Sequence, residues 1–265
     1  TPISCPPYYT PQSDKMEVAF QKKTTKITLG KSGIKTFFHR INPVRNRQKI
    51  QYQKTMLLYQ AAMEEVLTRI NILNREFKIE NSYSPIEHIS SRIKTPKSIY
   101  KKLQKHNLAM TMENMMRHVH DIAGIRIVCK FTSDIYSLVN LLENQHDIQI
   151  LEHKDYIKNR KESGYQSYHL IVSIPISLSE GTINTIVEIQ IRTIAMDFWA
   201  SIEHKIRYKY EKDIPPHIQR ELLECSDIVR FLDQKMLALN EEIYQEEADH
   251  KDDYEQMIDS LILQP

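Results

Sequence analysis

The sequence predicts an α+β protein in which two long helices bracket a middle region of shorter strands and helices. Two segments, residues 52–77 and 218–243, carry apolar residues at alternating spacings of four and three, the heptad pattern of long packed helices. Between them, short segments alternate apolar and polar residues with the period of two that half-buried strands show. The chain has 265 residues, 41% hydrophobic and 26% charged, which suits a globular protein of one or two domains.

Composition argues against several classes of protein. No apolar run approaches the ~18–20 residues that a membrane-spanning helix needs, so no membrane partner is expected. The three cysteines, Cys5, Cys129 and Cys225, are too scattered for a disulfide framework or a zinc knuckle, which favours a reducing, cytoplasmic location. The five glycines form neither GxGxxG nor GxxxxGK[ST], which argues against dinucleotide-binding and P-loop folds.

The N-terminal region, residues 1–47, shows no sustained hydrophobic period and has four prolines among its first eleven residues. Residues 1–54 hold eleven Lys and Arg against two acids, a net charge of +9; because the whole chain is +2, the remainder carries −7. We expect residues 1–47 to be a solvated, poorly ordered extension. Contact with nucleic acid or a membrane is the alternative.

The first long helix is predicted from about Lys49 to a point before Asn81. Its apolar seam is Tyr52, Met56, Tyr59, Met63, Val66, Ile70, Leu73 and Phe77.

A second helix is predicted to begin at Pro96, with Thr95 as its N-cap, after an extended lead-in that carries Arg92 and Lys94. Many cations gather around this helix N-terminus, which suits the binding of a polyphosphate. A solvated basic helix is an equally good interpretation of the same residues.

A strand is predicted over residues 121–131, with Asp121 just before it and Arg126 on one of its faces. A helix over 133–144 and a strand near 148–151 follow. The basic loop 154–169 interleaves tyrosines with cations, so an aromatic ring can stack on a base while Lys and Arg hold phosphates. A mobile surface loop is the alternative, although this loop runs straight into a strand over 168–174.

The next strand, Val187–Arg192, alternates strictly, with Val187, Ile189 and Ile191 on one face and Glu188, Gln190 and Arg192 on the other. A helix over 195–208 follows. The second long helix is predicted from Pro215 to about Tyr244, before a tail, residues 249–265, that holds one or two further helical turns. Its seam is Ile218, Leu222, Cys225, Val229, Leu232, Met236, Leu239 and Ile243.

The middle region supplies two acids at strand positions, Asp121 and Glu188, with cations at 92–102, at Arg126 and across 154–161. Two carboxylates among many phosphate-binding cations indicate Mg²⁺-assisted phosphoryl-group transfer, in which the acids hold the metal and the metal bridges polyphosphate oxygens. No Ser/His/Asp or Cys/His set supports nucleophilic catalysis.

Four ordered motifs, RIKTPKSI, DIAGIRI, YIKNRKESGYQSYH and VEIQIRTIAMDFWASIEH, resemble those of the RelA/SpoT-type synthetase domain, in particular of the single-domain small alarmone synthetases. The resemblance covers roughly residues 50–245. It implies a synthetase domain over 48–248, built on a nucleotidyltransferase-like mixed β-sheet flanked by helices. It also implies transfer of the β,γ-pyrophosphate of ATP to the 3′-OH of GTP or GDP in the bacterial stringent response, giving (p)ppGpp and AMP, by a cytoplasmic homotetramer.

The resemblance also assigns roles to single residues. It matches Asp121 and Glu188 to the metal-binding acids, and Glu188 is in addition the candidate proton acceptor. The residues matched to the ATP side are Arg92, Lys94, Ser98, Lys102 and Arg126. Those matched to the GTP or GDP side are Lys154, Lys161, Tyr165, His169, Gln190 and Asp197. Tyr165 is expected to stack on guanine, and Asp197 stands where relatives often carry Asn, so its carboxylate can accept from guanine N1–H and N2–H.

Two alternatives stay open. The segment Glu152–Asp155 mixes the acceptor-loop patterns of the long family members, so the choice between GTP and GDP is undecided. A toxic relative that makes (p)ppApp or pyrophosphorylates tRNA 3′ ends is the alternative function, since the basic extension would suit an RNA substrate. We nevertheless expect no nucleic-acid partner. A catalytically silent binding module is disfavoured because both acids are present.

Overall fold

The computed structural model describes the backbone of residues 43–210 and 214–262, and the side chains of residues 46–210 and 214–243. All described residues belong to one compact unit. The extension predicted over residues 1–47 therefore lies almost wholly outside the described residues. None of the described helices combines the length and the apolar character that a membrane crossing requires.

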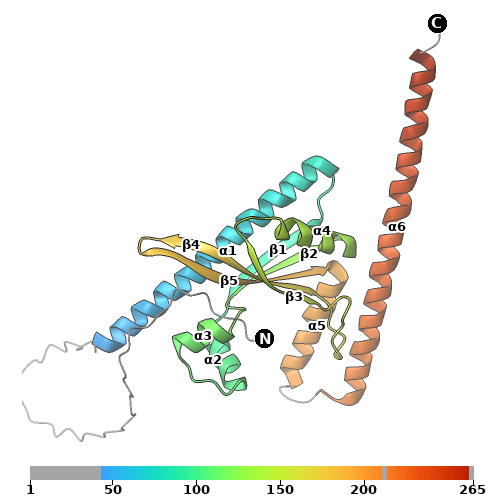
Figure 1. Ribbon diagram of the computed structural model, residues 1–265. Coiled ribbons are helices and arrows are strands. Elements are labelled where there is room, and N and C mark those ends of the chain that lie inside the picture. Colours follow the sequence, from blue (N-terminus) through green and yellow to red (C-terminus); the bar gives the residue numbers. More distant parts are fainter. Residues whose placement is uncertain (1–42, 211–213, 263–265) are drawn as a thin grey trace, which may run out of the picture. The chain divides into compact units, whose positions relative to one another are not determined.

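A five-stranded mixed sheet forms the centre of this unit (Figure 1). Its order is β1-β2-β5-β4-β3, and only β2 and β5 run parallel. The strands are β1 (Ile86–Ile93), β2 (Ala123–Cys129), β3 (Gln149–Asp155), β4 (Tyr168–Leu178) and β5 (Gly181–Thr193). The α+β class with a mixed sheet and flanking helices is confirmed.

The two faces of the sheet differ in polarity because strand side chains alternate. Val187, Ile189 and Ile191 of β5 are each fully buried in the main core. Glu188 and Gln190 point to the opposite face and are only half-buried. The alternation predicted for this strand is confirmed, and it separates a packed face from a polar one.

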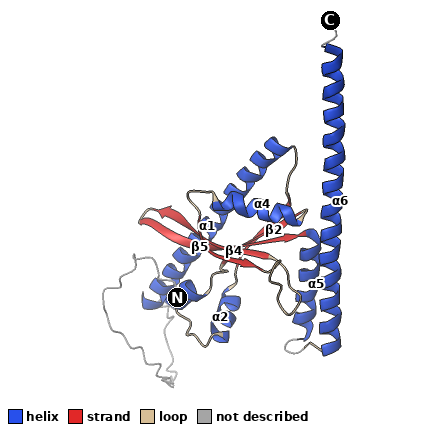
Figure 2. Cartoon of the chain, turned by 45° about the vertical axis from the view of Figure 1, so that its right-hand side comes forward, coloured by secondary structure: helices blue, strands red, loops and turns tan. Residues whose placement is uncertain are grey.

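Helices α1 (Pro43–Asn81) and α4 (Thr132–Glu143) pack on the apolar face of the sheet. Figure 2 shows α1 crossing the sheet, and its seam supplies Val66 and Ile70, both 0% exposed. From α4, Ile135 and Leu138 join the same cluster. The sequence spacing in α1 therefore places its apolar stripe toward the strands.

Helices α5 (Ile194–Tyr210) and α6 (Pro216–Ile262) pack against each other beside the sheet. Their contact is a second, smaller cluster around Trp199, Ala200 and Leu222. The later part of α6 extends away from the strands in both views (Figures 1 and 2). From Leu232 onward the residues predicted as the α6 seam are about half exposed.

Two short helices lie between β1 and β2 in the chain. Helix α2 (Pro96–Lys105) begins as predicted, with the Thr95 side chain accepting from the Ser98 amide and Pro96 in the first turn. Helix α3 (Met112–His118) is capped by Thr111 in the same way and is not among the predicted elements.

Of strand β1, only the end that carries Arg92 is predicted as extended; its isoleucines at 86, 89 and 93 have the spacing of a helix. A register irregularity between Ile86 and His88 explains the pattern: Ile86 pairs with Cys129 and Ile89 with Ile127, two residues that lie on one face of β2. The bulge thus turns a three-residue spacing into same-face positions.

Helix α6 differs from the prediction at its end. It continues through Tyr244 and past the expected tail boundary at 249 up to Ile262. No Gly or Pro occurs between Pro216 and Pro265, so the chain holds no residue that would stop the helix. The tail is part of one continuous helix as far as it is described.

Candidate active site

The polar face of the sheet aligns functional side chains in two neighbouring rows. In one row, Arg126 pairs with Gln190, Gln190 with His169, and His169 with Lys154, so four strands contribute one residue each. In the next row, Glu188 lies between Gly124 of β2 and Ile171 of β4. Cross-strand partners project to the same side, so these predicted site residues share one surface.

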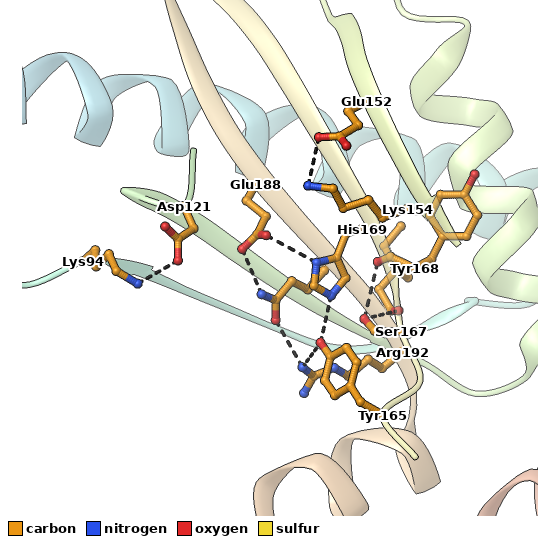
Figure 3. A network of polar contacts seen from close by, with 12 residues as sticks. Lys94, Asp121, Glu152, Lys154, Tyr165, Ser167, Tyr168, His169, Glu188 and Arg192 are labelled. Atoms are coloured by element: carbon orange, nitrogen blue, oxygen red, sulfur yellow. Dashed lines mark hydrogen bonds and ion pairs between the residues drawn. The ribbon is translucent and has the colours of Figure 1, made fainter. Parts of the chain in front are cut away.

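Asp121 forms a cluster with Lys94 and Lys102, and Figure 3 shows Asp121 and Lys94 beside Glu188. Lys94 Nζ lies 2.7 Å from Asp121 Oδ2, and Lys102 Nζ lies 2.8 Å from Oδ1. Burial raises the pKa of Asp121, but the hydrogen bonds and charges of Lys102 and Lys94 lower it by more, so the net effect is a pKa below its ordinary value. Asp121 is therefore ionised at neutral pH, and α2 is anchored to the start of β2.

Glu188 belongs to a closed ring of five side chains (Figure 3). Gln190 Nε2 donates to Glu188 Oε2 at 2.9 Å, and Arg192 donates to Gln190 Oε1 at 3.2 Å. Arg192 also donates to the Tyr165 hydroxyl at 2.7 Å, which lies 2.8 Å from His169 Nε2. His169 Nδ1 completes the ring, 3.3 Å from Glu188 Oε1.

The protonation state of His169 sets the direction of the hydrogen bonds in this ring. Burial, together with the charges of Arg192 and Lys161, lowers the pKa of His169 more than the hydrogen bond and charge of Glu188 raise it, so the imidazole is neutral near pH 7. With its hydrogen on Nδ1, the ring donates to Glu188 and accepts from Tyr165 at Nε2. The hydrogen bonds within the ring then run from the terminal nitrogens of Arg192 to the Glu188 carboxylate, while Arg192 Nε is buried without a partner in the described part of the chain.

Burial raises the pKa of Glu188, but the hydrogen bond from His169 and then that from Gln190 lower it below its usual value. The carboxylate is therefore ionised at neutral pH. The negative charge of Asp121 raises the pKa of Glu188, so the two acids lie near enough to interact electrostatically.

Lys161 of the loop between β3 and β4 and Lys154 of β3 lie close enough for their charges to interact. Lys161 Nζ lies 4.2 Å from the centroid of the Tyr156 ring and 5.1 Å from that of Tyr165. Burial lowers the pKa of Lys161, and the positive charge of Lys154 lowers it further. Lys154 is ion-paired with Glu152 at 2.9 Å, whereas Lys161 has no ion-pair partner among the described residues, so the Lys161 ammonium suits an anion such as a phosphate.

Three predicted site residues have partners other than those expected. The Asp197 carboxylate lies 2.9 Å from Arg192 and 3.5 Å from Arg126, so the proposed guanine acceptor is held by two guanidinium groups. The Ser98 hydroxyl is hydrogen-bonded to the Thr95 side chain at the start of α2. Arg92, an exposed residue of β1, pairs with Gly124 and therefore lies in the same row as Glu188, with β2 between them.

Sequence reasoning missed Arg192 as a site residue. Its side chain is 5% exposed and donates to Asp197, Tyr165 and Gln190. The strand alternation carried the signal, because Arg192 shares a face with Glu188 and Gln190. Tyr156, whose ring packs edge-on against His169, was also missed.

The acid pair fits a magnesium ion. Mg²⁺ in phosphoryl-transfer sites is bound by one or two carboxylates, with substrate phosphates and water as the other ligands. Asp121 and Glu188 supply two ionised carboxylates that interact with each other. In the described part of the chain no cluster of three or more His, Cys, Asp or Glu forms a metal cage, so substrate oxygens would complete the coordination.

Comparisons with known proteins point to one family. A family model described as "Region found in RelA / SpoT proteins" matches residues 91–213. GTP pyrophosphokinase YwaC of Bacillus subtilis is 43% identical over 192 residues, covering 72% of this chain and 91% of that protein.

Two solved structures of small alarmone synthetase 1 from Bacillus subtilis share the fold. The one bound to its product pppGpp has a TM-score of 0.68 and 35% identity, covering 73% of this chain and 98% of that one. The one bound to AMPCPP has a TM-score of 0.63 and 33% identity, covering 74% and 98%. With this identity over nearly the whole length of its relatives, the chain belongs to the RelA/SpoT-type synthetases, among the small alarmone synthetases.

Proposed function

We propose that this protein is a (p)ppGpp synthetase that transfers the β,γ-pyrophosphate of ATP to the 3′-OH of GTP or GDP and releases AMP. The observation that carries the proposal is the placement of two ionised carboxylates, Glu188 on the polar sheet face and Asp121 just before β2, between two groups of cations. The matched relatives are GTP pyrophosphokinases, which favours GTP or GDP over adenosine nucleotides or tRNA as the acceptor.

The donor side is the cluster around Asp121. Lys94 and Lys102 hold their ammonium groups at its carboxylate, where they can also neutralise the polyphosphate of ATP. We assign Arg92, Ser98 and Arg126 to the same side, as the resemblance implies. The AMPCPP complex of a relative supports an ATP-like donor for this chain.

The acceptor side is the face around Lys154, Lys161 and Tyr165. Its two cations suit the 5′-phosphates of the acceptor, and the Tyr165 ring suits the base. Arg192 binds both the Asp197 carboxylate and the Tyr165 hydroxyl, so we assign base recognition to Tyr165 and Asp197. The pppGpp complex of a relative supports a guanosine polyphosphate at this side.

Glu188 is the proposed proton acceptor from the 3′-OH. The ring through His169 and Gln190 holds its carboxylate ionised and fixed in orientation, which a general base requires before the substrate arrives. Mg²⁺ bound at Asp121 and Glu188 would supply charge neutralisation at the polyphosphate oxygens. Lys94 and Lys102 add positive charge where negative charge develops in transfer.

The test of this function is the choice of acceptor. The purified protein is incubated with β,γ-labelled ATP, Mg²⁺ and one of GDP, GTP, ADP or deacylated tRNA, and the products are separated by chromatography. We expect label on GDP or GTP together with release of AMP. Label only on ADP or tRNA would replace the proposal with the toxic-relative function, and no labelling with any acceptor would refute it.

We also propose a cytoplasmic homotetramer. The later part of α6 supports self-association, because its apolar side chains are exposed in the single chain: Ile228, Phe231, Leu232, Met236, Leu239 and Ile243 are 48–65% exposed. Light scattering after size-exclusion chromatography should give four times the chain mass of 31.3 kDa. A monomer at micromolar concentration would contradict the assembly without affecting the proposed reaction.

A further inference from the structure

The tip of the acceptor loop is fastened to helix α6. Ser226 of α6 is 1% exposed, and its hydroxyl donates to the Gly164 carbonyl at 2.5 Å. Gln166 Nε2 donates back to the Ser226 hydroxyl at 3.1 Å and reaches its carbonyl at 3.3 Å. Residues 164 and 166 flank Tyr165, so these bonds fix the backbone on both sides of the ring assigned to the acceptor base.

The loop and the helix also meet in close packing. Gly164 has φ +89°, and a Cβ built there would lie 2.9 Å from the Ser226 Cβ and 3.3 Å from the Trp199 ring. Only glycine allows this approach and this backbone conformation together. Trp199 in turn donates from Nε1 to the Leu222 carbonyl at 2.9 Å, which holds α6 one turn before Ser226.

An ion pair closes the contact at its solvent-facing rim. Arg160, at the start of the loop tip, donates to Asp227 of α6 at 2.5 Å and lies 3.5 Å from the Ser226 hydroxyl. Within the tip the chain makes only short-range backbone bonds, between Gly164 and Lys161 and between Lys161 and Tyr165. The long-range backbone support of the tip therefore comes from α6.

We propose that Ser226 is a positioning residue for the acceptor nucleotide: α6 holds the 160–166 tip, and with it Lys161 and Tyr165, in the geometry that the acceptor binds. The proposal rests on the assignment of this loop to the acceptor under the proposed function. It adds that acceptor affinity is set by a helix that contributes no group to the reacting atoms. ATP binding, at the Asp121 cluster on the other side of Glu188, does not depend on this contact.

The first test is Ser226→Ala, which leaves the Gly164 carbonyl without its buried donor and the Gln166 amide with only the backbone carbonyl of residue 226. Cys225→Ala, an exposed neighbour on the same helix, is the matched control. We expect the KM for GDP or GTP to rise about tenfold in Ser226→Ala, with kcat and the KM for ATP within about twofold. Equal changes in both KM values, or a loss of thermal stability with neither KM changed, would overturn the proposal.

A second test applies if Ser226→Ala does not fold. It is a double-mutant cycle at the exposed rim with Asp227→Asn, Arg160→Gln and the double variant. We expect each single change to raise the acceptor KM twofold to fivefold, and the double variant to be no worse than Arg160→Gln alone. Additive effects would mean that Arg160 contacts the acceptor directly, which would overturn the proposal at this pair.

Hydrogen exchange separates this proposal from the proposed function. Without any nucleotide, amides of a peptide spanning 158–166 should exchange at least tenfold faster in Ser226→Ala than in Cys225→Ala. If the wild-type protein transferred no pyrophosphate to any acceptor, the proposed function would fail while this result still stood. Unchanged exchange would refute the fastening itself, whatever the activity.

Discussion

Replacing Asp233 of α6 with Asn should stabilise the protein at neutral pH. Asp233 is 8% exposed, and its carboxylate accepts a 2.7 Å hydrogen bond from the Thr193 hydroxyl at the end of β5. Burial raises the pKa of Asp233 to about 6, against an ordinary value of 3.8, although the Thr193 hydrogen bond lowers it. No ion pair holds this carboxylate among the described residues.

The size of the effect follows from linkage. A pKa raised from 3.8 to about 6 in the folded state corresponds to about 3 kcal/mol between the protonated and the ionised forms. The folded protein binds this proton more tightly than the unfolded chain. This contribution to stability is therefore complete below pH 3.8 and is lost as the pH rises to about 6. The amide of the Asp233→Asn variant could still accept from Thr193 and would carry no charge at any pH.

The assay is urea unfolding of the wild type and of Asp233→Asn between pH 4 and pH 8 at one protein concentration, because association also adds to apparent stability. The gain in unfolding free energy for Asp233→Asn should grow with pH, to at most about 3 kcal/mol above pH 7. Glu224→Gln, an exposed acid on the same helix, is the control and should show no such growth. A constant difference across this pH range would refute the reasoning.

Three further predictions concern the ring and the core. Glu188→Gln keeps the shape of the side chain but removes the proton acceptor, so pyrophosphate transfer should fall about 10²- to 10⁴-fold in the labelling assay. Near-normal turnover would exclude a general-base role. Arg192→Lys replaces a planar guanidinium that is hydrogen-bonded to three neighbours with a single ammonium group, so kcat should fall at least tenfold. Normal kinetics would show that the ring does not position Glu188. Ile70→Ala, at a position that is 0% exposed, should lower the unfolding free energy by about 2–5 kcal/mol. Ile79→Ala, at a position 83% exposed on the same helix, should change it by less than about 0.5 kcal/mol. Equal losses of unfolding free energy in urea would contradict the placement of α1.

The secondary structure could be predicted wherever its signal is local. The alternation of Val187–Arg192 fixed which side chains face the core, and the Thr95-Pro96 pair fixed the start of α2. Strand β1 could not be predicted in this way, because its bulge at Ile86–His88 gives it the spacing of a helix. The register that resolves this spacing exists only once β1 is paired with β2.

The apolar seam of α6 shows a second limit of local pattern. Its spacing predicts a helix correctly but does not say which part of the helix is covered. Leu222 is buried against α5, while Leu239 and Ile243, in the same pattern, are about half exposed. Only the position of the helix relative to the sheet separates these cases.

The sequence by itself determined the family and located the two acids and the cation-rich segments as candidate site residues, because residue types and order along the chain carry that information. Tertiary structure decided how these groups are connected. The row from Arg126 to Lys154 depends on strand order, and the ring through Arg192 and Tyr165 closes between residues far apart in sequence. The bond from Ser226 to Gly164 joins residues 62 positions apart. Pairings of this kind arise from packing and hydrogen-bond satisfaction in the folded chain, to which no local sequence pattern corresponds.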